Sequence, residues 1–199
     1  MTSPLVPTSI SRRAGAAVAV VVLSLALGAC SSSGKPGATA NTTSNDAKGT
    51  AALLQKALQE QVAGDLTQAE TDFKEVIRRD PNNKYAFYDL GLIYQTQRKN
   101  SDSEAQYRLA LTIDPKFGPA LYNLGILRTI ANDTPGAISL YRQAIAANEK
   151  DPNAHYNLGL LLRGQGKTDE GNQEVQTAVD LDPSLRAKAV KEGVPLTGS

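Results

Sequence analysis

The residue types best suited to nucleophilic, acid–base or metal-binding chemistry occur once each in this sequence, as Cys30 and His155. One thiolate and one imidazole cannot supply the four ligands of a tetrahedral zinc site, and a lone cysteine cannot form an internal disulfide. The sequence has no phosphate-binding glycine loop, no G-x-S-x-G elbow and no H-E-x-x-H helix. Acidic pairs such as Glu149 and Asp151 lie at an expected turn. We therefore expect no catalytic residues, no cofactor, no metal and a structural role for His155.

Cys30 ends a segment with a distinct pattern. Arg12 and Arg13 precede residues 14–29, AGAAVAVVVLSLALGA, which carry no charge. Positive charge followed by a short apolar run and small residues is typical of a secretory signal peptide, and the run is short for a membrane-spanning helix. Leu27-Gly28-Ala29-Cys30 resembles the lipobox of bacterial lipoproteins, in which the cysteine is lipidated and the preceding peptide is removed.

The lipobox resemblance implies that residues 1–29 are a lipoprotein signal peptide and that Cys30 is the lipidation site. Each buried CH₂ of an acyl chain contributes about 0.8 kcal/mol, so two or three chains hold a soluble domain on a membrane. We expect a lipid-anchored protein on the extracytoplasmic face of the cell membrane, or on the outer membrane of a two-membrane bacterium. An ordinary secretion signal, or an uncleaved anchor with an incidental cysteine, is the alternative interpretation.

The segment after the cysteine predicts a spacer. Residues 30–49, CSSSGKPGATANTTSNDAKG, contain no aromatic residue and no Val, Ile or Leu. Such a composition cannot bury enough apolar surface to offset the entropy of ordering, so we expect a disordered linker.

The overall charge argues against nucleic acid as a partner. The 199 residues carry a formal net charge of +1, with no polybasic run. Binding to a nucleic acid depends on a concentrated positive field, which this sequence does not supply.

From about residue 50 the sequence repeats itself with a period of 34 residues. The strings AFYDLG at 86–91, ALYNLG at 120–125 and AHYNLG at 154–159 mark the repeat. A second set of positions holds small residues and a third holds large ones at the same spacing. The small set is Ala69, Ser103, Ala137 and Gly171, and the large set is Phe73, Tyr107, Tyr141 and Val175.

This pattern resembles the tetratricopeptide repeat (TPR), a helix–turn–helix unit. The resemblance covers residues 50–183, in units of about 50–83, 84–117, 118–151 and 152–185. It implies an all-α, right-handed superhelical solenoid of about four repeats. Residues 184–199 are expected to form a short capping helix and a tail that frays from Val194 onward.

Two departures from the family pattern stand out. The first unit has Lys56-Ala57 in place of Leu-Gly and Glu60 in place of an aromatic, which suggests a degenerate, capping first helix. At the junction of the third and fourth units, Asp151-Pro152 comes three residues later than the equivalent Asp-Pro pairs. We expect a longer preceding helix or a shifted turn there.

The TPR resemblance also implies a concave groove, lined by the first helix of each unit, that holds peptides or partner helices. Tyrosine rings with amide side chains beside them suit a peptide ligand, although they also serve generic repeat construction. Asp89 occupies a position at which some TPR domains use an amide to hold a terminal carboxylate, which disfavours that binding mode. The expected groove residues are Tyr88, Asp89, Leu92, Tyr122, Asn123, Ile126, Tyr156, Asn157, Leu160 and Arg163.

The resemblance implies a non-catalytic, membrane-tethered adaptor for protein or peptide partners in the cell envelope. Assembly of secretion, pilus or cell-wall machinery is the expected setting. A self-assembling structural module is one alternative, with oligomeric state left open. A wall-remodelling enzyme is the other.

Overall fold

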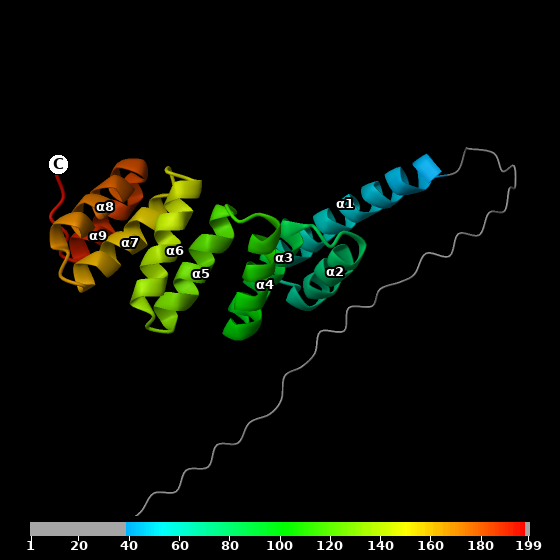
Figure 1. The fold of residues 1–199 in the computed structure, drawn as a ribbon, viewed down its shortest axis with the longest axis horizontal. Coiled ribbons are helices and arrows are strands. Elements are labelled where there is room, and N and C mark those ends of the chain that lie inside the picture. The colour runs from blue at the N-terminus through cyan, green and yellow to red at the C-terminus, as the bar shows by residue number, and fades with distance from the viewer. Residues whose placement is uncertain (1–38, 198–199) are drawn as a thin grey trace, which may run out of the picture. The chain divides into compact units, whose positions relative to one another are not determined.

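The computed structural model describes the backbone of residues 39–197 and the side chains of residues 46–197. Within that range the chain is helical and contains no strand. Its helices pair into four hairpins that follow one another in a row (Figure 1). The all-α repeat architecture predicted from the sequence is therefore confirmed. The expected signal peptide, Cys30 and the first part of the linker lie outside the described residues.

The helix boundaries reproduce the sequence period. The first helices of the hairpins are α1 (Thr39–Ala63), α3 (Lys84–Thr96), α5 (Gly118–Ile130) and α7 (Pro152–Gly164). The second helices are α2 (Leu66–Arg79), α4 (Asn100–Ile113), α6 (Thr134–Ala147) and α8 (Thr168–Leu181). A short 3₁₀ turn, η1 (Pro183–Leu185), leads into α9 (Arg186–Lys191). Equivalent helices from α2 to α8 begin 34 residues apart.

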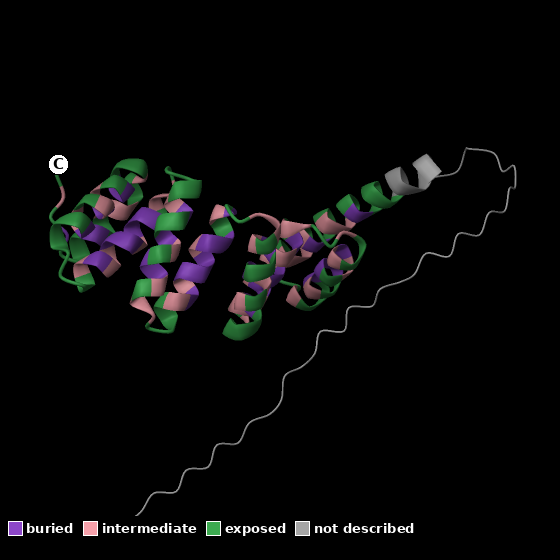
Figure 2. Cartoon of the chain, viewed as in Figure 1, coloured by how far each residue is buried: buried purple, intermediate pink, exposed green. Residues whose placement is uncertain are grey.

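The core of each hairpin lies where its first helix approaches its second. A Cβ atom added to Gly91 would lie 2.5 Å from a ring carbon of Tyr107, and one added to Gly125 would lie 2.6 Å from Tyr141. The missing side chain therefore makes room for the aromatic ring. Ser103 donates a hydrogen bond from Oγ to the Gly91 carbonyl at 2.8 Å, which holds the helices together at this contact. Buried residues consequently lie between the helices, with exposed residues outside (Figure 2).

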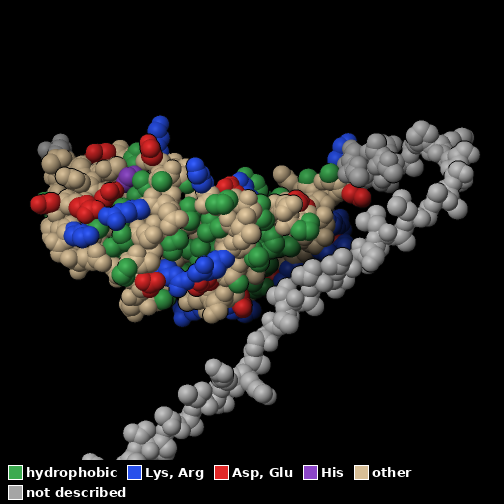
Figure 3. Space-filling model, viewed as in Figure 1, with side chains coloured by type: hydrophobic (Ala, Val, Ile, Leu, Met, Phe, Trp, Pro, Cys, Tyr) green, Lys and Arg blue, Asp and Glu red, His purple; other side chains and the backbone are tan. Residues whose placement is uncertain are grey.

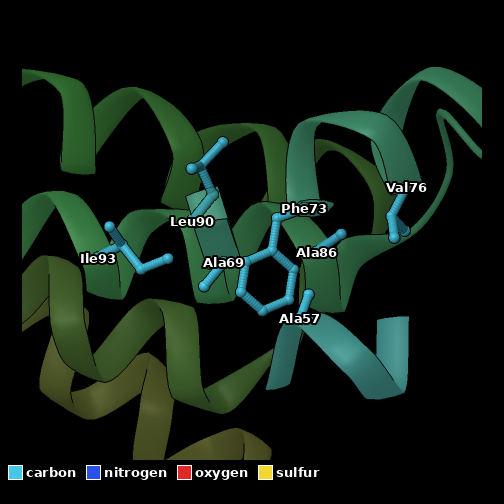
Figure 4. Close-up of a cluster of buried hydrophobic side chains, with 7 residues drawn as sticks. All are labelled: Ala57, Ala69, Phe73, Val76, Ala86, Leu90 and Ile93. Atoms are coloured by element: carbon cyan, nitrogen blue, oxygen red, sulfur yellow. The ribbon is translucent and has the colours of Figure 1, made fainter. Parts of the chain in front are cut away.

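The first hairpin replaces part of this packing with charge. Lys56 donates from Nζ to Oδ2 of Asp72 at 2.5 Å and lies 2.9 Å from Oε1 of Glu60. The departures from the repeat pattern thus form an ion-pair network between α1 and α2. Ala57 takes the glycine position, and it packs with Phe73 in a buried apolar cluster (Figure 4).

Helix α1 begins earlier than the sequence predicts. It starts at Thr39, so residues 39–49, expected to be disordered linker, are helical. Thr50 is buried and donates from Oγ1 to the Asp46 carbonyl at 2.9 Å. Adding residues to an existing helix avoids the cost of nucleation, which explains how a segment without large apolar residues continues α1.

The junction between the third and fourth hairpins is regular, so the expected longer helix or shifted turn is wrong. Helices α4, α6 and α8 each contain 14 residues. Asn148 caps the end of α6 as Asp114 caps that of α4, and its side chain accepts from the Lys150 backbone N–H at 3.2 Å. Asparagine and aspartate both stabilise such turns. Pro152 is the first residue of α7, with Asp151 as its N-cap.

The C-terminal segment caps the last hairpin, as predicted, but the expected fraying from Val194 is wrong. Val194 is buried, and its N–H donates to the Ala189 carbonyl at 3.0 Å. Leu196 packs against the same apolar cluster, and the Thr197 N–H donates to Oε1 of Gln176 at 2.8 Å. These contacts hold the tail on α8.

Candidate protein-binding face

The residues predicted to line the groove lie on α3, α5 and α7, the first helices of three consecutive hairpins. We call the surface formed by these positions and their equivalents on α1 the first-helix face. The predicted residues on it fall into three groups, which bond to one another, support the C-terminal cap or remain partly open.

Tyrosines and asparagines of neighbouring repeats bond to one another across the first-helix face. Asn123 donates from Nδ2 to the Tyr88 hydroxyl at 3.1 Å and to the Pro119 carbonyl at 3.0 Å. Asn157 donates in the same way to the Tyr122 hydroxyl at 3.2 Å. The amides expected to hold a peptide backbone therefore already join α3 to α5 and α5 to α7.

Tyr156, the last tyrosine of this series, is covered by the chain itself. Only 1% of its surface is exposed, and it shares a buried cluster with Ala189 and Val194. The ammonium group of Lys188 lies 4.4 Å from its ring centroid. Its hydroxyl is buried and has no hydrogen-bond partner among residues 46–197. The C-terminal cap thus removes Tyr156 from the open face.

Two further predicted residues on α7 also serve the cap. Arg163 donates from Nη2 to the Gly193 carbonyl at 2.9 Å and bonds through Nη1 to Asn172. Leu160 packs against the apolar cluster that holds Val194. Most of the α7 positions predicted to line the groove are therefore occupied by contacts within the chain, whereas Leu92 on α3 and Ile126 on α5 remain partly exposed.

The partly open surface is largely apolar. Leu92 and Ile126 are half-buried, and equivalent or nearby positions add side chains that were not predicted from the sequence. Val62 is 90% exposed and lines a shallow pocket of about 380 Å³ on α1 with Leu58, while Ile130 is 56% exposed. Both lie at the thirteenth position of their units, where a repeat alignment could have found them.

Asp89 introduces a carboxylate into this apolar surface. It occupies the position that Asn123 holds in the next repeat, and its side chain is half-buried. Burial raises the pKa of its carboxyl group to about 6, because desolvation penalises the charged form.

A second partly apolar surface lies between second helices. A cleft of about 510 Å³ is lined by leucines of α4, α5 and α6 and by Arg108 and Arg128. Both arginines pair with Glu104, so their charge is partly compensated. Hydrophobic side chains also gather over the middle of the molecule as viewed in Figure 3, with Lys and Arg side chains along the lower edge.

The residues considered for catalysis have structural surroundings. His155 is 9% exposed, with Nδ1 2.6 Å from Oε2 of Glu174 and Nε2 3.1 Å from the Glu149 carbonyl. Both ring nitrogens therefore have partners, as expected of a structural histidine. Across the side chains that the structure describes, no cluster of His, Cys, Asp and Glu is placed to hold a metal ion. No described helix is both long and apolar enough to cross a bilayer.

Three family models match the chain. Residues 54–116 and 152–185 match models described as tetratricopeptide repeat, and residues 127–166 match one described as TPR repeat. No curated protein matches the sequence.

Solved TPR structures share the fold. PilF of Pseudomonas aeruginosa superposes with a TM-score of 0.64 at 20% identity, covering 75% of this chain and 71% of that chain. PilW, described as a type IV pilus biogenesis factor, gives 0.63 at 21% identity, with coverage of 72% and 70%. YrrB, described as a TPR protein with an unusual peptide-binding site, gives 0.60 at 20% identity, with coverage of 74% and 77%. The family matches and the shared fold together show that the chain contains a TPR domain and belongs to the tetratricopeptide-repeat family.

Proposed function

We propose that this protein is a non-catalytic adaptor that binds a segment of a partner protein over the first-helix face. The observation that carries this proposal is the line of apolar side chains on that face, from Val62 and Leu58 on α1, through Leu92 on α3, to Ile126 and Ile130 on α5. Val62 and Ile130 are exposed, and Leu58, Leu92 and Ile126 are half-buried. Apolar side chains that remain at the surface in this way mark interaction sites. The description of YrrB as having a peptide-binding site supports the same use of the fold.

We further propose that the adaptor acts in the cell envelope and is tethered through a lipid on Cys30. The sequence Leu27-Gly28-Ala29-Cys30, after an uncharged run and two arginines, supports this part of the proposal. PilF and PilW share the fold, and the description of PilW as a type IV pilus biogenesis factor supports a role in assembly.

The test of the binding face is site-specific photo-crosslinking in cells that naturally produce the protein. A photoreactive amino acid replaces Ile130 on α5 or, as a matched control, Leu109 on α4, since the two side chains are 56% and 43% exposed. We expect a discrete protein adduct from position 130 and none from position 109. An adduct from position 109 alone, or from neither position, would contradict the proposal.

A matched pair of substitutions gives an independent readout. Ile130→Glu places a charge on the first-helix face and should abolish co-purification of the crosslinked partner, because desolvating the new carboxylate is costly. Leu109→Glu adds the same charge to α4 and should leave co-purification unchanged. Equal loss with both variants would show that the effect is not specific to the face.

A further inference from the structure

Asp89 breaks the hydrogen-bonding series that joins the first helices. At the equivalent position, Asn123 and Asn157 each donate to a tyrosine hydroxyl of the preceding repeat. The preceding repeat of Asp89 has Leu54 where those tyrosines stand. The preceding repeat therefore offers Asp89 no tyrosine hydroxyl of the kind that Asn123 and Asn157 bind.

No described group compensates the Asp89 charge. Among residues 46–197 its carboxylate has no hydrogen bond and no ion pair. The nearest cations in the sequence of α1 and α3 are committed elsewhere, since Lys56 binds Asp72 and Lys84 binds Asp114 at 2.6 Å. A half-buried carboxylate without a partner is costly in a folded chain.

The surroundings of Asp89 suit a long cationic side chain. Tyr85 lies one helical turn before Asp89 and Leu92 lies one turn after it, so the three side chains share a face of α3. Tyr85 is 53% exposed, and Leu92 is half-buried. A lysine or arginine stem can lie along such apolar surface while its charged end reaches the carboxylate.

We propose that the partner segment is an apolar peptide that carries one lysine or arginine, and that this cation pairs with Asp89. The inference rests on the proposed function, because it assigns the chemistry of the ligand on the first-helix face. It follows from charge complementarity, since this part of the face offers one uncompensated negative group within apolar surroundings. A partner with a free carboxylate at this point would be repelled.

The experiment is a selection from a random peptide display library against the immobilised full chain. Three baits are compared: the wild type, Asp89→Asn, and Asp102→Asn, which makes the same change at an exposed position of α4. We expect peptides with clustered apolar residues and one Lys or Arg from the wild type and from Asp102→Asn. With Asp89→Asn the apolar residues should remain enriched, whereas the enrichment of the cation should be lost.

Affinities then test the pair directly. The best peptide and its copy with the cation replaced by methionine are titrated against wild type and Asp89→Asn. Replacing the cation removes a charge-assisted hydrogen bond, so the affinity of the peptide for the wild type should fall by about tenfold or more. For Asp89→Asn the two peptides should bind equally.

The outcomes separate the two proposals. Apolar peptides without cation enrichment, whose binding is lost in Ile130→Glu, would overturn the pairing with Asp89 and leave the proposed function standing. No enriched peptide, or binding unaffected by Ile130→Glu, would overturn both. If the wild-type chain self-associates in sedimentation and Asp89→Asn does not, the cation belongs to a second copy, which would overturn the assignment to a separate partner.

Discussion

At the scale of single residues, side chains on one face of α3 have different tasks. Tyr88 accepts a hydrogen bond from Asn123 and so supports the stacking of repeats. Asp89, the next residue, has no such partner among residues 46–197 and carries a raised pKa. Groups with strongly perturbed pKa values are concentrated at functional sites, which supports the pairing proposed for Asp89.

The raised pKa predicts how stability depends on pH. The folded chain holds the Asp89 proton more tightly than the unfolded chain, in which aspartate titrates near about 3.9. The contribution of this group to the free energy of unfolding is therefore fully present below about pH 4 and is lost as the pH rises through about 6. The tyrosines beside Asp89, Tyr88 and Tyr107, stay neutral in this window, because tyrosine ordinarily titrates at about 10 and burial raises the pKa of both side chains further.

Urea unfolding of Asp89→Asn and wild type checks this expectation. At pH 7.5 the variant should be more stable by about 1 to 3 kcal/mol, and near pH 4 the difference should largely disappear. Asp102→Asn is the control, and its difference from wild type should not change with pH in this way. A pH-independent effect of Asp89→Asn would show that the carboxylate is not desolvated.

Glycine gives a second prediction at this scale. In Gly125→Ala the added methyl group would lie 2.6 Å from a Tyr141 ring carbon, so α5 and α6 must move apart or the ring must shift. We expect a loss of about 1 to 3 kcal/mol in unfolding free energy. Gly164→Ala, at the end of α7, has no neighbouring atom within 4 Å and should be neutral or stabilising. Thermal unfolding of both variants measures the contrast.

At the scale of the helices, the asparagine series sets how neighbouring hairpins meet. Asn123 is 8% exposed and reaches from α5 to the Tyr88 hydroxyl of α3. A buried amide must keep its hydrogen bonds, so this contact selects one register of α5 against α3. The sequence pattern placed tyrosine and asparagine on one face, but their pairing across repeats depends on how closely the hairpins stack.

A double-mutant cycle on Tyr88 and Asn123 measures this contact. Asn123→Ala should cost about 1 to 3 kcal/mol, because it removes the amide and leaves the Pro119 carbonyl without this donor. Tyr88→Phe should cost less, and the coupling between the two should be about 0.5 to 1.5 kcal/mol. Asn153→Ala, an exposed position on α7, is the control for loss of an asparagine. Additive effects of Tyr88→Phe and Asn123→Ala would show that the bond does not contribute.

At the scale of the whole molecule, the two ends of the repeat array differ. The C-terminal cap covers Tyr156 and binds Arg163, so the first-helix face closes at α7. At the other end, α1 leaves Val62 and Leu58 on the surface. The partner segment that we propose would therefore lie over α1, α3 and α5, which is also where Asp89 lies.

The proposed membrane tether gives a prediction for the full chain. Cys30→Ala removes the thiol that would carry the lipid, and each lost acyl chain withdraws about 0.8 kcal/mol of membrane affinity for every buried CH₂. We expect the variant to leave the membrane fraction and to incorporate no radiolabelled fatty acid, whereas Cys30→Ala should not change the helical content measured by circular dichroism. Full membrane attachment of the variant would contradict the lipid anchor.

The sequence alone determined the repeat architecture. Its period of 34 residues, the small residues opposite the large ones and the Leu-Gly pairs predict stacked helical hairpins, because each hairpin can bury its apolar face only against a neighbour. The resemblance to the TPR family placed Tyr88, Asp89 and Leu92 among the expected groove residues, on the first helix of their unit. A local pattern suffices for these features, since every repeat makes the same contacts with the next.

The tertiary structure decided what the periodic pattern could not, because these features depend on contacts between residues that are not periodic. Helix α1 extends back to Thr39, and Asn148 takes the role of aspartate at a regular junction. Val194 and Leu196 bind the last hairpin and withdraw Tyr156 from the open face. Asp89 has no tyrosine hydroxyl to bind, because the preceding repeat has Leu54 at the tyrosine position. Only the stacked helices show that its carboxylate is left half-buried beside an apolar surface.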